Sequence, residues 1–338
     1  MEIKENFNLK SLNTFGINVD AKYFCSVASI EDLKIARKFA LQNNIPLLVI
    51  GGGSNLLFAG NFNGLVIKIN LMGVEVLKEN PEHVFIKVAA GENWDSFVQY
   101  CAHNGFAGIE NLSLIPGNVG ASPIQNIGAY GVEMRDHFEE LEFYNFESEK
   151  VRAFNEKECA FGYRYSIFKG ELKDKGVILS VTYRLDKVPV FKTGYGTVRD
   201  ELNRMEVKEL SINSIREAVI RIRKSKLPDP AEIGNAGSFF KNPSISAVQH
   251  DILKKQYPDL VSFAQSDNTY KLAAGWLIDC CGWKGYREGN AGVHDRQALV
   301  LVNHSNASGM EILNLSEKIQ KSVFEKFGVA LELEVNVV

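Results

Sequence analysis

A run of three glycines follows the strand that we predict at Leu47–Ile50. Glycine permits backbone conformations that are closed to other residues, and residues 51–55 add Ser54 and Asn55, which have short hydrogen-bonding side chains. Backbone N–H groups in such a segment can form a nest for a pyrophosphate. A tight turn between two strands would have the same composition, so the segment alone leaves both interpretations open.

The residues that follow the glycines leave no room for a helix. Leu56 and Leu57 are followed by a second turn at residues 60–64 and by a predicted strand at residues 65–69. A dinucleotide site of the Rossmann type needs a long helix directly after the glycines, so that the helix N-terminus can face the pyrophosphate. The sequence therefore disfavours a Rossmann fold.

The remaining periodicity predicts a mixed α+β architecture. Ser29 is a good helix N-cap, and Leu33, Ala36 and Ala40 share one face of the helix that follows it. The final helix begins at a capping box, and two alternating segments in the middle of the chain are expected to be antiparallel strands. We predict further strands at residues 84–88, 141–146, 177–185 and 297–303, and further helices at residues 93–103, 214–225, 246–256, 271–280 and 309–327.

Residues 330–338 alternate apolar and polar side chains, which predicts a strand. Glu332 and Glu334 project from the same face of this strand, and one of them could point into a cleft. Glu334 is flanked by Leu333 and Val335, and a carboxyl group among apolar neighbours can have a raised pKa that suits protonation chemistry. A solvated strand face is the alternative, and the local sequence does not distinguish the two acids.

The composition is that of an ordinary globular protein. The chain has 338 residues, of which 45% are hydrophobic, so it is long enough for two or three domains. Its formal net charge is −3 and its basic residues are scattered, so we expect no broad basic surface for nucleic acid or an anionic membrane. An anionic ligand must therefore be bound by a few residues at a local site. Pro228 and Pro230 end the basic helix predicted at residues 214–225, and we expect a domain boundary there.

The five cysteines show no metal-binding pattern. They have no CxxC spacing and no companion histidines at metal-ligand intervals, so we predict no metal site and expect reduced thiols of a cytosolic protein. Residues 1–20 lack the apolar core of a signal peptide, and the apolar runs are too short to span a bilayer. We therefore expect a cytoplasmic protein that binds no membrane and no nucleic acid.

Residues 111–131 form a long loop with almost no charge. A surface loop would normally be more polar, and long loops without secondary structure are usually functional. This loop could wrap an extended, partly apolar ligand with its backbone amides, and a flat aromatic cofactor would fit. A buried structural loop is the alternative interpretation.

Several polar residues are candidates for chemistry. Arg164 lies among aromatic residues, where a guanidinium can hold a carboxylate with two parallel hydrogen bonds, although most arginines are surface or salt-bridging residues. Ser238 lies outside any GxSxG motif, so it is better suited to pass a proton than to attack an acyl group, and a loop or N-cap hydroxyl is the alternative. Lys226 and Lys271 could each bind a phosphate, but most lysines are solvated.

Several motifs in one order give the chain a resemblance to a known family. Together they closely resemble the UDP-N-acetylenolpyruvoylglucosamine reductases, also called UDP-N-acetylmuramate dehydrogenases, and the match runs nearly end to end. Tyr195 and residues 274–279 look like the longer of the family's two types, which has extra substrate-domain elements. The motifs that carry the resemblance lie at residues 12–16, 51–57, 91–94, 115–131, 161–164, 226–230, 235–243 and 272–279.

The resemblance implies a two-part FAD-binding module, similar to the vanillyl-alcohol-oxidase group, followed by an α+β substrate-binding domain. The module would span residues 1–225, with subdomains at about 1–70 and 71–225, and the substrate-binding domain would span residues 226–329. Residues 330–338 would form a strand that returns to the active site. NADPH would reduce FAD, leave, and be replaced by the UDP-N-acetylglucosamine enolpyruvyl ether, and the family likeness suggests a monomer.

The resemblance also implies roles for individual residues. Arg164 and Glu334 would stabilise an enolate-like intermediate at the substrate carboxylate, and Ser238 would supply the proton. Phe263 falls where some relatives use a tyrosine, so a hydroxyl contact to the nucleotide would be missing here. The implied substrate-binding residues are Tyr130, Tyr195, Lys226, Asn242, Lys271 and Gln297. The implied FAD-binding residues are Gly51, Gly52, Gly53, Ser54, Asn55, Pro116, Gly117, Ser122, Pro123, Ile124 and Gly128.

Two other functions are compatible with parts of this pattern. Another FAD-dependent oxidoreductase of the same superfamily would share the FAD module, but it need not carry the motif at residues 235–243 or the C-terminal acid. A non-catalytic UDP-sugar sensor would have no reason to retain Arg164, Ser238 and Glu334 together. Consumption of NADPH would separate these alternatives from the reductase.

Overall fold

The computed structural model describes residues 1–338, which fold into two compact units. Each unit is built from three segments of the chain. Unit 1 comprises Met1–Phe7, Ala21–Gly52 and Asn63–Ser225, and unit 2 comprises Asn8–Asp20, Gly53–Phe62 and Lys226–Val338.

The first sheet of unit 1 has the strand order β1-β2-β5-β3. Its strands β3 and β5 run parallel, with Leu47 opposite Leu65, and helix α1 connects β2 to β3. The side chain of Ser29 caps α1 by accepting a hydrogen bond from the backbone of Asp32, as predicted. The elements are β1 (Lys4–Asn8), β2 (Asp20–Val27), α1 (Ile30–Gln42), β3 (Leu47–Ile50) and β5 (Phe62–Ile69).

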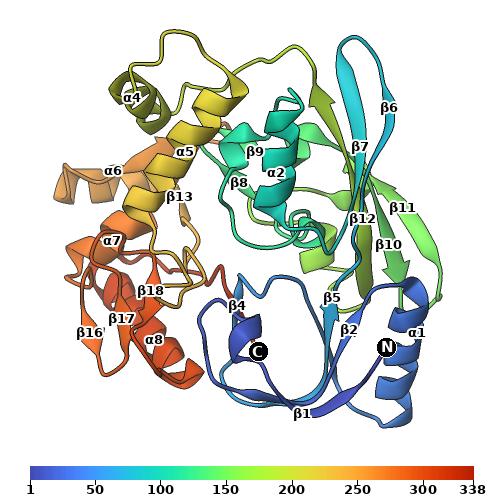
Figure 1. Ribbon diagram of the computed structural model, residues 1–338. Helices are drawn as coiled ribbons and strands as arrows, with labels where there is room; N and C mark the ends of the chain where they lie inside the picture. The colour runs from blue at the N-terminus through green and yellow to red at the C-terminus, as the bar shows by residue number, and fades with distance from the viewer. The chain divides into compact units, whose positions relative to one another are not determined.

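A five-stranded antiparallel sheet forms the second layer of unit 1, in the order β11-β10-β12-β7-β6. Helix α2 lies beside this sheet (Figure 1). The helix and the sheet share a core, in which the rings of Trp94 and Tyr183 are 5.9 Å apart. The predicted antiparallel strands and the predicted helix are therefore confirmed. The elements are β6 (Val74–Glu79), β7 (His83–Ala89), α2 (Trp94–His103), β10 (Phe138–Asn145), β11 (Val151–Asn155) and β12 (Gly176–Asp186).

The stretch between α2 and β10, which includes the uncharged loop, contains only short turns of 3-10 helix and a hairpin of two two-residue strands. These are η2 (Glu110–Leu112), η3 (Val119–Ala121), β8 (Gly128–Ala129), β9 (Val132–Glu133) and η4 (Met134–His137). Further along unit 1, helices α4 and α5 pack against each other through the buried side chains of Val198, Leu202, Ile215 and Val219. The remaining elements are α3 (Glu156–Cys159), η5 (Ile167–Lys169), α4 (Gly196–Arg204) and α5 (Ile212–Lys226).

Unit 2 combines two three-stranded sheets, ordered β13-β15-β14 and β16-β17-β18, with three helices. The C-terminal strand β19 pairs in parallel with β4, which follows the triple glycine. The elements are η1 (Lys10–Leu12), β4 (Leu56–Leu57), β13 (Ser244–Ser246), α6 (Ala247–Gln256), β14 (Ser262–Ala264), β15 (Thr269–Leu272), α7 (Ala274–Cys280), β16 (Arg287–Glu288), β17 (Ala291–Val293), β18 (Leu301–Asn303), α8 (Gly309–Phe327) and β19 (Asn336–Val337).

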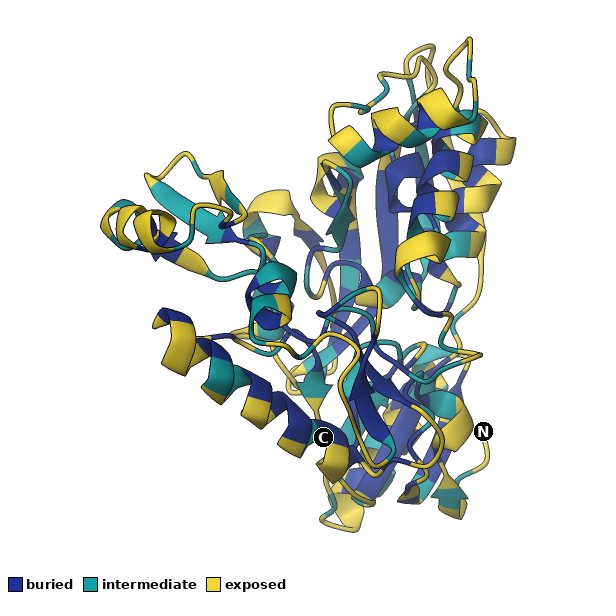
Figure 2. Ribbon diagram, turned by 90° about the vertical axis from the view of Figure 1, so that its left-hand side faces the viewer, coloured by how far each residue is buried: buried dark blue, intermediate teal, exposed yellow.

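Helix α8 has the start and stop that the sequence predicts. The Ser308 hydroxyl accepts a 3.2 Å hydrogen bond from the backbone of Glu311, and the Glu311 carboxylate accepts one of 2.8 Å from the backbone of Ser308. Gly328 ends the helix in the left-handed conformation. The helices bury one face and expose the other (Figure 2). In α8 the buried face includes Ile312, Leu315, Ile319, Val323 and Phe327.

Three predicted boundaries are wrong. The helix predicted at residues 271–280 begins only at Ala274, because Lys271 belongs to β15, where it pairs with Ser244. The strand predicted at residues 297–303 is shortened to Leu301–Asn303, because the backbone N–H of Val300 closes a turn on the carbonyl of Gln297. In the C-terminal segment only Asn336–Val337 forms a regular strand, since the residues before it make single bridges instead of a ladder.

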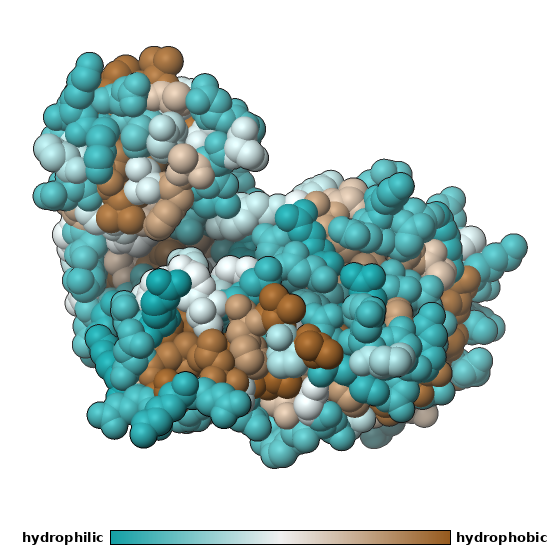
Figure 3. Space-filling view, turned by 90° about the horizontal axis from the view of Figure 1, so that it is seen from above, coloured by the Kyte–Doolittle hydropathy of each residue, from teal (hydrophilic) through white to brown (hydrophobic).

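The surface carries hydrophilic side chains with apolar patches between them, as the face in Figure 3 shows. No helix has both the length and the apolar character needed to cross a membrane. No group of three or more His, Cys, Asp or Glu side chains is arranged to hold a metal ion. Cys25, Cys101 and Cys159 are buried free thiols, and burial raises the pKa of Cys25 to about 11 and that of Cys159 to about 12.

Candidate active site

The triple glycine and the uncharged loop meet in unit 1. A Cβ atom at Gly52 would lie 2.7 Å from Asn118 Oδ1 and 3.0 Å from the Cα atom of Gly117. A Cβ atom at Gly51 would also touch the Asn118 side chain, at 3.4 Å. Two segments that the sequence analysis assigned separately to the cofactor are therefore packed backbone to backbone, and Gly52 itself is exposed.

Gly53 continues this segment in unit 2 and needs to be glycine. Its φ is +64°, and a Cβ atom there would lie 2.0 Å from the carbonyl oxygen of Leu12. The Gly53 carbonyl accepts a 3.1 Å hydrogen bond from the backbone of Thr14. The glycine therefore allows the chain to pass directly against the turn at residues 12–14, which belongs to a motif of the resemblance.

Most polar groups of the uncharged loop are bonded inside unit 1. The Ser122 hydroxyl lies 2.8 Å from that of Tyr183, and the carbonyl of Ile124 accepts a 2.7 Å hydrogen bond from the Ser166 hydroxyl. Ser122 and Pro123 are buried, whereas Pro116 and Ile124 are exposed. The loop is therefore a rigid support with an exposed apolar edge, a surface that suits a flat ring system.

Arg164 lies at the corner of a tight turn in unit 1. The backbone groups of Gly162 and Tyr165 bond to each other across the turn, at 3.0 and 3.2 Å. Arg164 has a φ of +53°, which an arginine rarely adopts and which is often found at functional sites. Its Nη1 atom donates a 3.2 Å hydrogen bond to the carbonyl of Gly128, and the guanidinium lies 5.7 Å from the ring centre of Tyr163.

Arg223, which the sequence analysis missed, lies in the same part of unit 1. Its charge acts on the hydroxyl group of Tyr130 and on the guanidinium of Arg164. Burial lowers the pKa of Arg223 and raises that of Tyr130. The rings of Tyr130 and Tyr195 are in edge contact at 5.9 Å, although Tyr195 is half exposed. Arg223 lies two helical turns after Arg216 on a basic helix, so the two arginines share one face. This spacing is the sequence feature that could have identified Arg223 as a candidate.

Ser238 follows a turn in unit 2 that its own segment stabilises. The buried side chain of Asn235 accepts a 2.9 Å hydrogen bond from the backbone of Gly237, whose φ is +70°. Ser238 then bridges Val300, and the next residue, Phe239, is fully buried. The hydroxyl of Ser238 is therefore carried on a fixed, half-buried backbone, instead of capping a helix.

The two C-terminal acids have different environments. Glu332 is exposed and forms a 2.8 Å ion pair with Lys241, whereas Glu334 is 9% exposed. The backbone N–H of Glu334 donates to the carbonyl of Phe239, at 2.8 Å. The Glu334 carbonyl accepts a 3.3 Å hydrogen bond from Asn55. Glu334 thus lies beside both the serine segment and the glycine segment of unit 2.

Three candidate substrate residues gather where α7 begins. Asn242 accepts a 2.9 Å hydrogen bond from the backbone of Ala274, and Gln297 Oε1 lies 3.1 Å from the Cβ position of Gly275. Lys271 lies in β15, immediately before this helix.

Two further candidates for binding the substrate are exposed: Lys226 at the end of α5, and Tyr195 before α4. Phe263, the residue that departs from the family pattern, is exposed on β14.

These features fit a bound FAD. The close glycine backbones at Gly52 and Gly53 leave no room for side chains, and glycines of this kind allow a phosphate group to approach backbone N–H groups. The uncharged loop offers apolar and backbone groups to an isoalloxazine ring. The glycine segment and the uncharged loop therefore have features that suit a flavin. In unit 2, Ser238 carries a hydroxyl group and Glu334 a buried carboxyl group.

Comparison with known proteins identifies the class first. A family model described as an FAD binding domain matches residues 21–155, which makes the chain an FAD-binding oxidoreductase of α+β fold, as expected. A second model, described as the C-terminal domain of UDP-N-acetylenolpyruvoylglucosamine reductase, matches residues 229–338.

The particular family follows from the full-length relatives. The reductase of that name from Flavobacterium johnsoniae is 48% identical and that from Amoebophilus asiaticus is 49% identical, each over 100% of both chains. The crystal structure of UDP-N-acetylenolpyruvylglucosamine reductase from Thermus caldophilus has a TM-score of 0.69 at 26% identity, over 99% of this chain and 98% of that chain. The chain belongs to the UDP-N-acetylenolpyruvoylglucosamine reductase family.

Proposed function

We propose that this protein uses NADPH and FAD to reduce the enolpyruvyl ether of UDP-N-acetylglucosamine to UDP-N-acetylmuramate. The observation that carries the proposal is the pairing of the buried Glu334 with Phe239, which holds the C-terminal acid segment against the segment that contains Ser238, in a chain that belongs to this reductase family. The product is a precursor of peptidoglycan, so the protein would support cell-wall synthesis and, through it, cell shape and division. We further propose that it acts in the cytoplasm as a monomer.

Arg164 and Glu334 are proposed to bind the carboxylate of the substrate. FAD, when bound, would supply to the terminal vinyl carbon the hydride that NADPH provides. Negative charge then develops on the carboxylate that is conjugated to the reacting carbon. A fixed guanidinium and a protonated acid stabilise this charge better than they stabilise the neutral double bond, which lowers the barrier.

Ser238 is proposed to donate the proton that completes the reduction. The proton goes to the carbon that carries the carboxylate, so that hydride and proton together saturate the double bond. Support comes from the rigid turn at Asn235 and Gly237, because a proton donor must be held within hydrogen-bond reach of its acceptor. The serine does not form a covalent bond in this scheme, in agreement with the absence of a GxSxG motif.

The binding residues and domains follow the same proposal. Residues 1–225 would hold FAD, residues 226–329 would bind the UDP-sugar, and residues 330–338 would return to the active site. The family models at residues 21–155 and 229–338 support this division. The remaining site residues are proposed to bind FAD through the glycine segment and the uncharged loop, and the nucleotide sugar through Tyr130, Tyr195, Lys226, Asn242, Lys271 and Gln297.

An anaerobic experiment tests the proposal. The purified protein is reduced with NADPH while its visible spectrum is recorded, and the UDP-enolpyruvyl sugar is then added. The flavin band should bleach with NADPH and recover only after the sugar is added. A flavoprotein that bleaches but is not reoxidised by this sugar would be a different oxidoreductase. A protein that binds the sugar but never binds FAD would be a sensor.

A further inference from the structure

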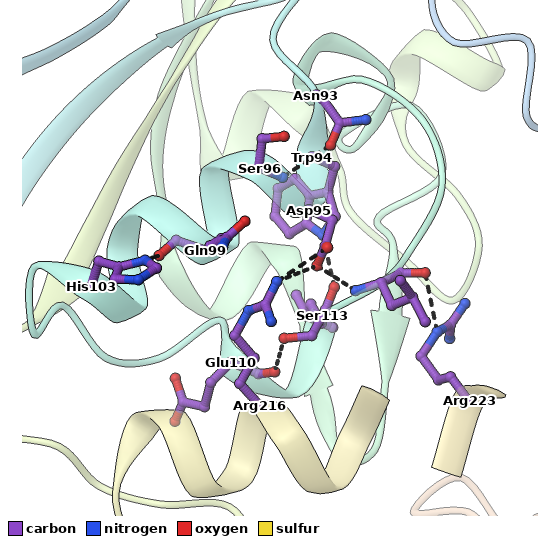
Figure 4. Close-up of polar contacts among 12 residues, drawn as sticks. Asn93, Trp94, Asp95, Ser96, Gln99, His103, Glu110, Ser113, Arg216 and Arg223 are labelled. Atoms are coloured by element: carbon purple, nitrogen blue, oxygen red, sulfur yellow. Dashed lines mark hydrogen bonds and ion pairs between the residues drawn. The ribbon is translucent and has the colours of Figure 1, made fainter. Parts of the chain in front are cut away.

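Asp95 connects the uncharged loop to helix α5 within unit 1. It lies in the first turn of α2, and its Oδ1 atom accepts a 2.6 Å hydrogen bond from the backbone N–H of Leu114. Its two carboxylate oxygens lie 3.2 and 3.1 Å from one terminal nitrogen of Arg216 (Figure 4). The side chains of Asp95 and Arg216 are 27% and 16% exposed, so this pair is shielded from solvent more than a typical surface pair.

Leu114 has a backbone conformation that is unfavourable for leucine. Its φ is +58°, in the left-handed region that a leucine rarely occupies. While its N–H donates to Asp95, its carbonyl accepts a 3.2 Å hydrogen bond from Arg223 Nε. Both backbone polar groups of this strained residue are therefore bound by charged side chains from neighbouring helices. Leu114 begins the segment that leads to Pro116 and Gly117.

The same network aligns two arginines on α5. Arg216 and Arg223 are two helical turns apart and lie on the same face. Arg216 is paired with Asp95, and Arg223 bonds to the carbonyl of Leu114 and interacts electrostatically with Tyr130. The carboxylate of Asp95 therefore helps to determine where Arg223 lies relative to Tyr130.

We propose that Asp95 is a positioning residue, which acts through Leu114 and Arg216 to hold the flavin-lining loop and Arg223 in place for cofactor binding. This inference rests on the proposed function, because it assigns the loop to the flavin. Loss of the carboxylate charge leaves the Arg216 guanidinium without its partner in a shielded site. It also weakens the hydrogen bond that keeps Leu114 in the left-handed region, because a charged acceptor binds an N–H group more strongly than a neutral one.

Asp95→Asn is the direct test, because the amide has nearly the same shape and keeps an oxygen acceptor for Leu114. The measurements are the dissociation constant of FAD from protein stripped of flavin and refilled, the visible spectrum of the bound flavin, and its midpoint potential. We expect FAD to bind roughly tenfold more weakly and the flavin bands to shift, which corresponds to loss of one charge-assisted contact. The matched control is Glu217→Gln, which removes the exposed 2.7 Å pair with Arg221 on the same helix and should leave FAD binding unchanged.

A second variant keeps the test valid if Asp95→Asn does not fold. Arg216→Gln removes the same ion pair and leaves the hydrogen bond of Asp95 to Leu114 intact, so it should change the flavin spectrum in the same direction but less. Both substitutions break the same ion pair between Asp95 and Arg216. The double variant should therefore bind FAD only slightly more weakly than Asp95→Asn alone. A lowered melting temperature with wild-type FAD affinity, spectrum and potential would overturn the inference. If the wild-type protein itself binds no FAD, the proposed function fails instead.

Discussion

The backbone N–H of Glu334 donates a 2.8 Å hydrogen bond to the carbonyl of Phe239, the residue that follows Ser238. The C-terminal segment thereby lies against the serine segment, although the two are far apart in the sequence. Phe240 extends the contact by bridging Leu333. This pairing fixes the backbones of the two segments relative to each other, and a fixed backbone is needed if two groups are to act on one substrate.

Replacing Ser238 by alanine should separate the two half-reactions. The flavin should still be reduced by NADPH at the wild-type rate, because the serine has no part in that step. Its reoxidation by the UDP-enolpyruvyl sugar should slow by roughly 10²- to 10⁴-fold, the range for loss of a general acid. Anaerobic stopped-flow measurement of the flavin band follows both steps. Ser244→Ala, at an exposed position on β13, is the control, and equal rates for the two variants would remove Ser238 from the mechanism.

The two C-terminal acids form a natural matched pair. Glu334→Ala should lower the rate of flavin reoxidation by roughly 10²- to 10³-fold, as expected for loss of a group that stabilises developing charge. Glu332→Ala removes an exposed ion pair with Lys241 and should change this rate less than threefold. The same half-reaction assay, applied to both variants, decides between the acids. A larger defect in the Glu332 variant would show that the wrong acid has been assigned.

Arg164→Lys keeps the positive charge but loses the planar fork that binds a carboxylate at two points. We expect kcat for the sugar to fall roughly 10- to 100-fold, since a charged hydrogen bond contributes about 1.5–3 kcal/mol. Reduction of the flavin by NADPH should be unaffected. Arg135→Lys is the control, because Arg135 is also in unit 1 and bonds to the carbonyl of Phe161 in the same segment. Full activity of Arg164→Lys would argue against a bidentate carboxylate contact.

The glycine segment can be tested with one added methyl group. Gly53→Ala should destabilise the fold by about 1–3 kcal/mol, because its Cβ would collide with the Leu12 carbonyl 2.0 Å away at a positive φ. Gly52→Ala should weaken FAD binding by crowding Asn118. Gly60→Ala, with nothing within 4 Å and no positive φ, is the control. Urea unfolding and FAD titration measure the two effects, and wild-type values for both variants would contradict the close packing described for this segment.

Glu110 should make the protein less stable as the pH rises from acid to neutral. Burial raises the pKa of this carboxyl group, although its Oε2 atom accepts a 2.6 Å hydrogen bond from the backbone of Gly108 and His137 lies nearby. The folded state therefore holds the proton to a higher pH than the unfolded state, and stability is lost between the two pKa values. Glu110→Gln should melt higher than wild type at pH 7 and close to it at pH 4. A constant difference across this range would contradict the predicted shift.

Local features were predictable from the sequence because their causes are local. The caps at Ser29 and Ser308 and the stop at Gly328 depend on residues within one turn of a helix, and the structure has them where expected. Lys271 was misplaced because its helical pattern competes with a pairing to Ser244, a residue that lies distant in the chain. Strand pairing between residues distant in the chain can override local helix propensity, and the local sequence gives no signal of it.

The sequence by itself determined the α+β class, the glycine segment without a following helix, and the family motifs that point to FAD and a UDP-sugar. The family resemblance aligned Glu334, but the local pattern could not distinguish it from Glu332, because two acids on one alternating strand look alike until their neighbours are known. Only the tertiary structure placed Lys241 beside one and Phe239 beside the other. It also revealed the link from Asp95 to Arg223, since burial and hydrogen-bond geometry depend on which distant segments come together.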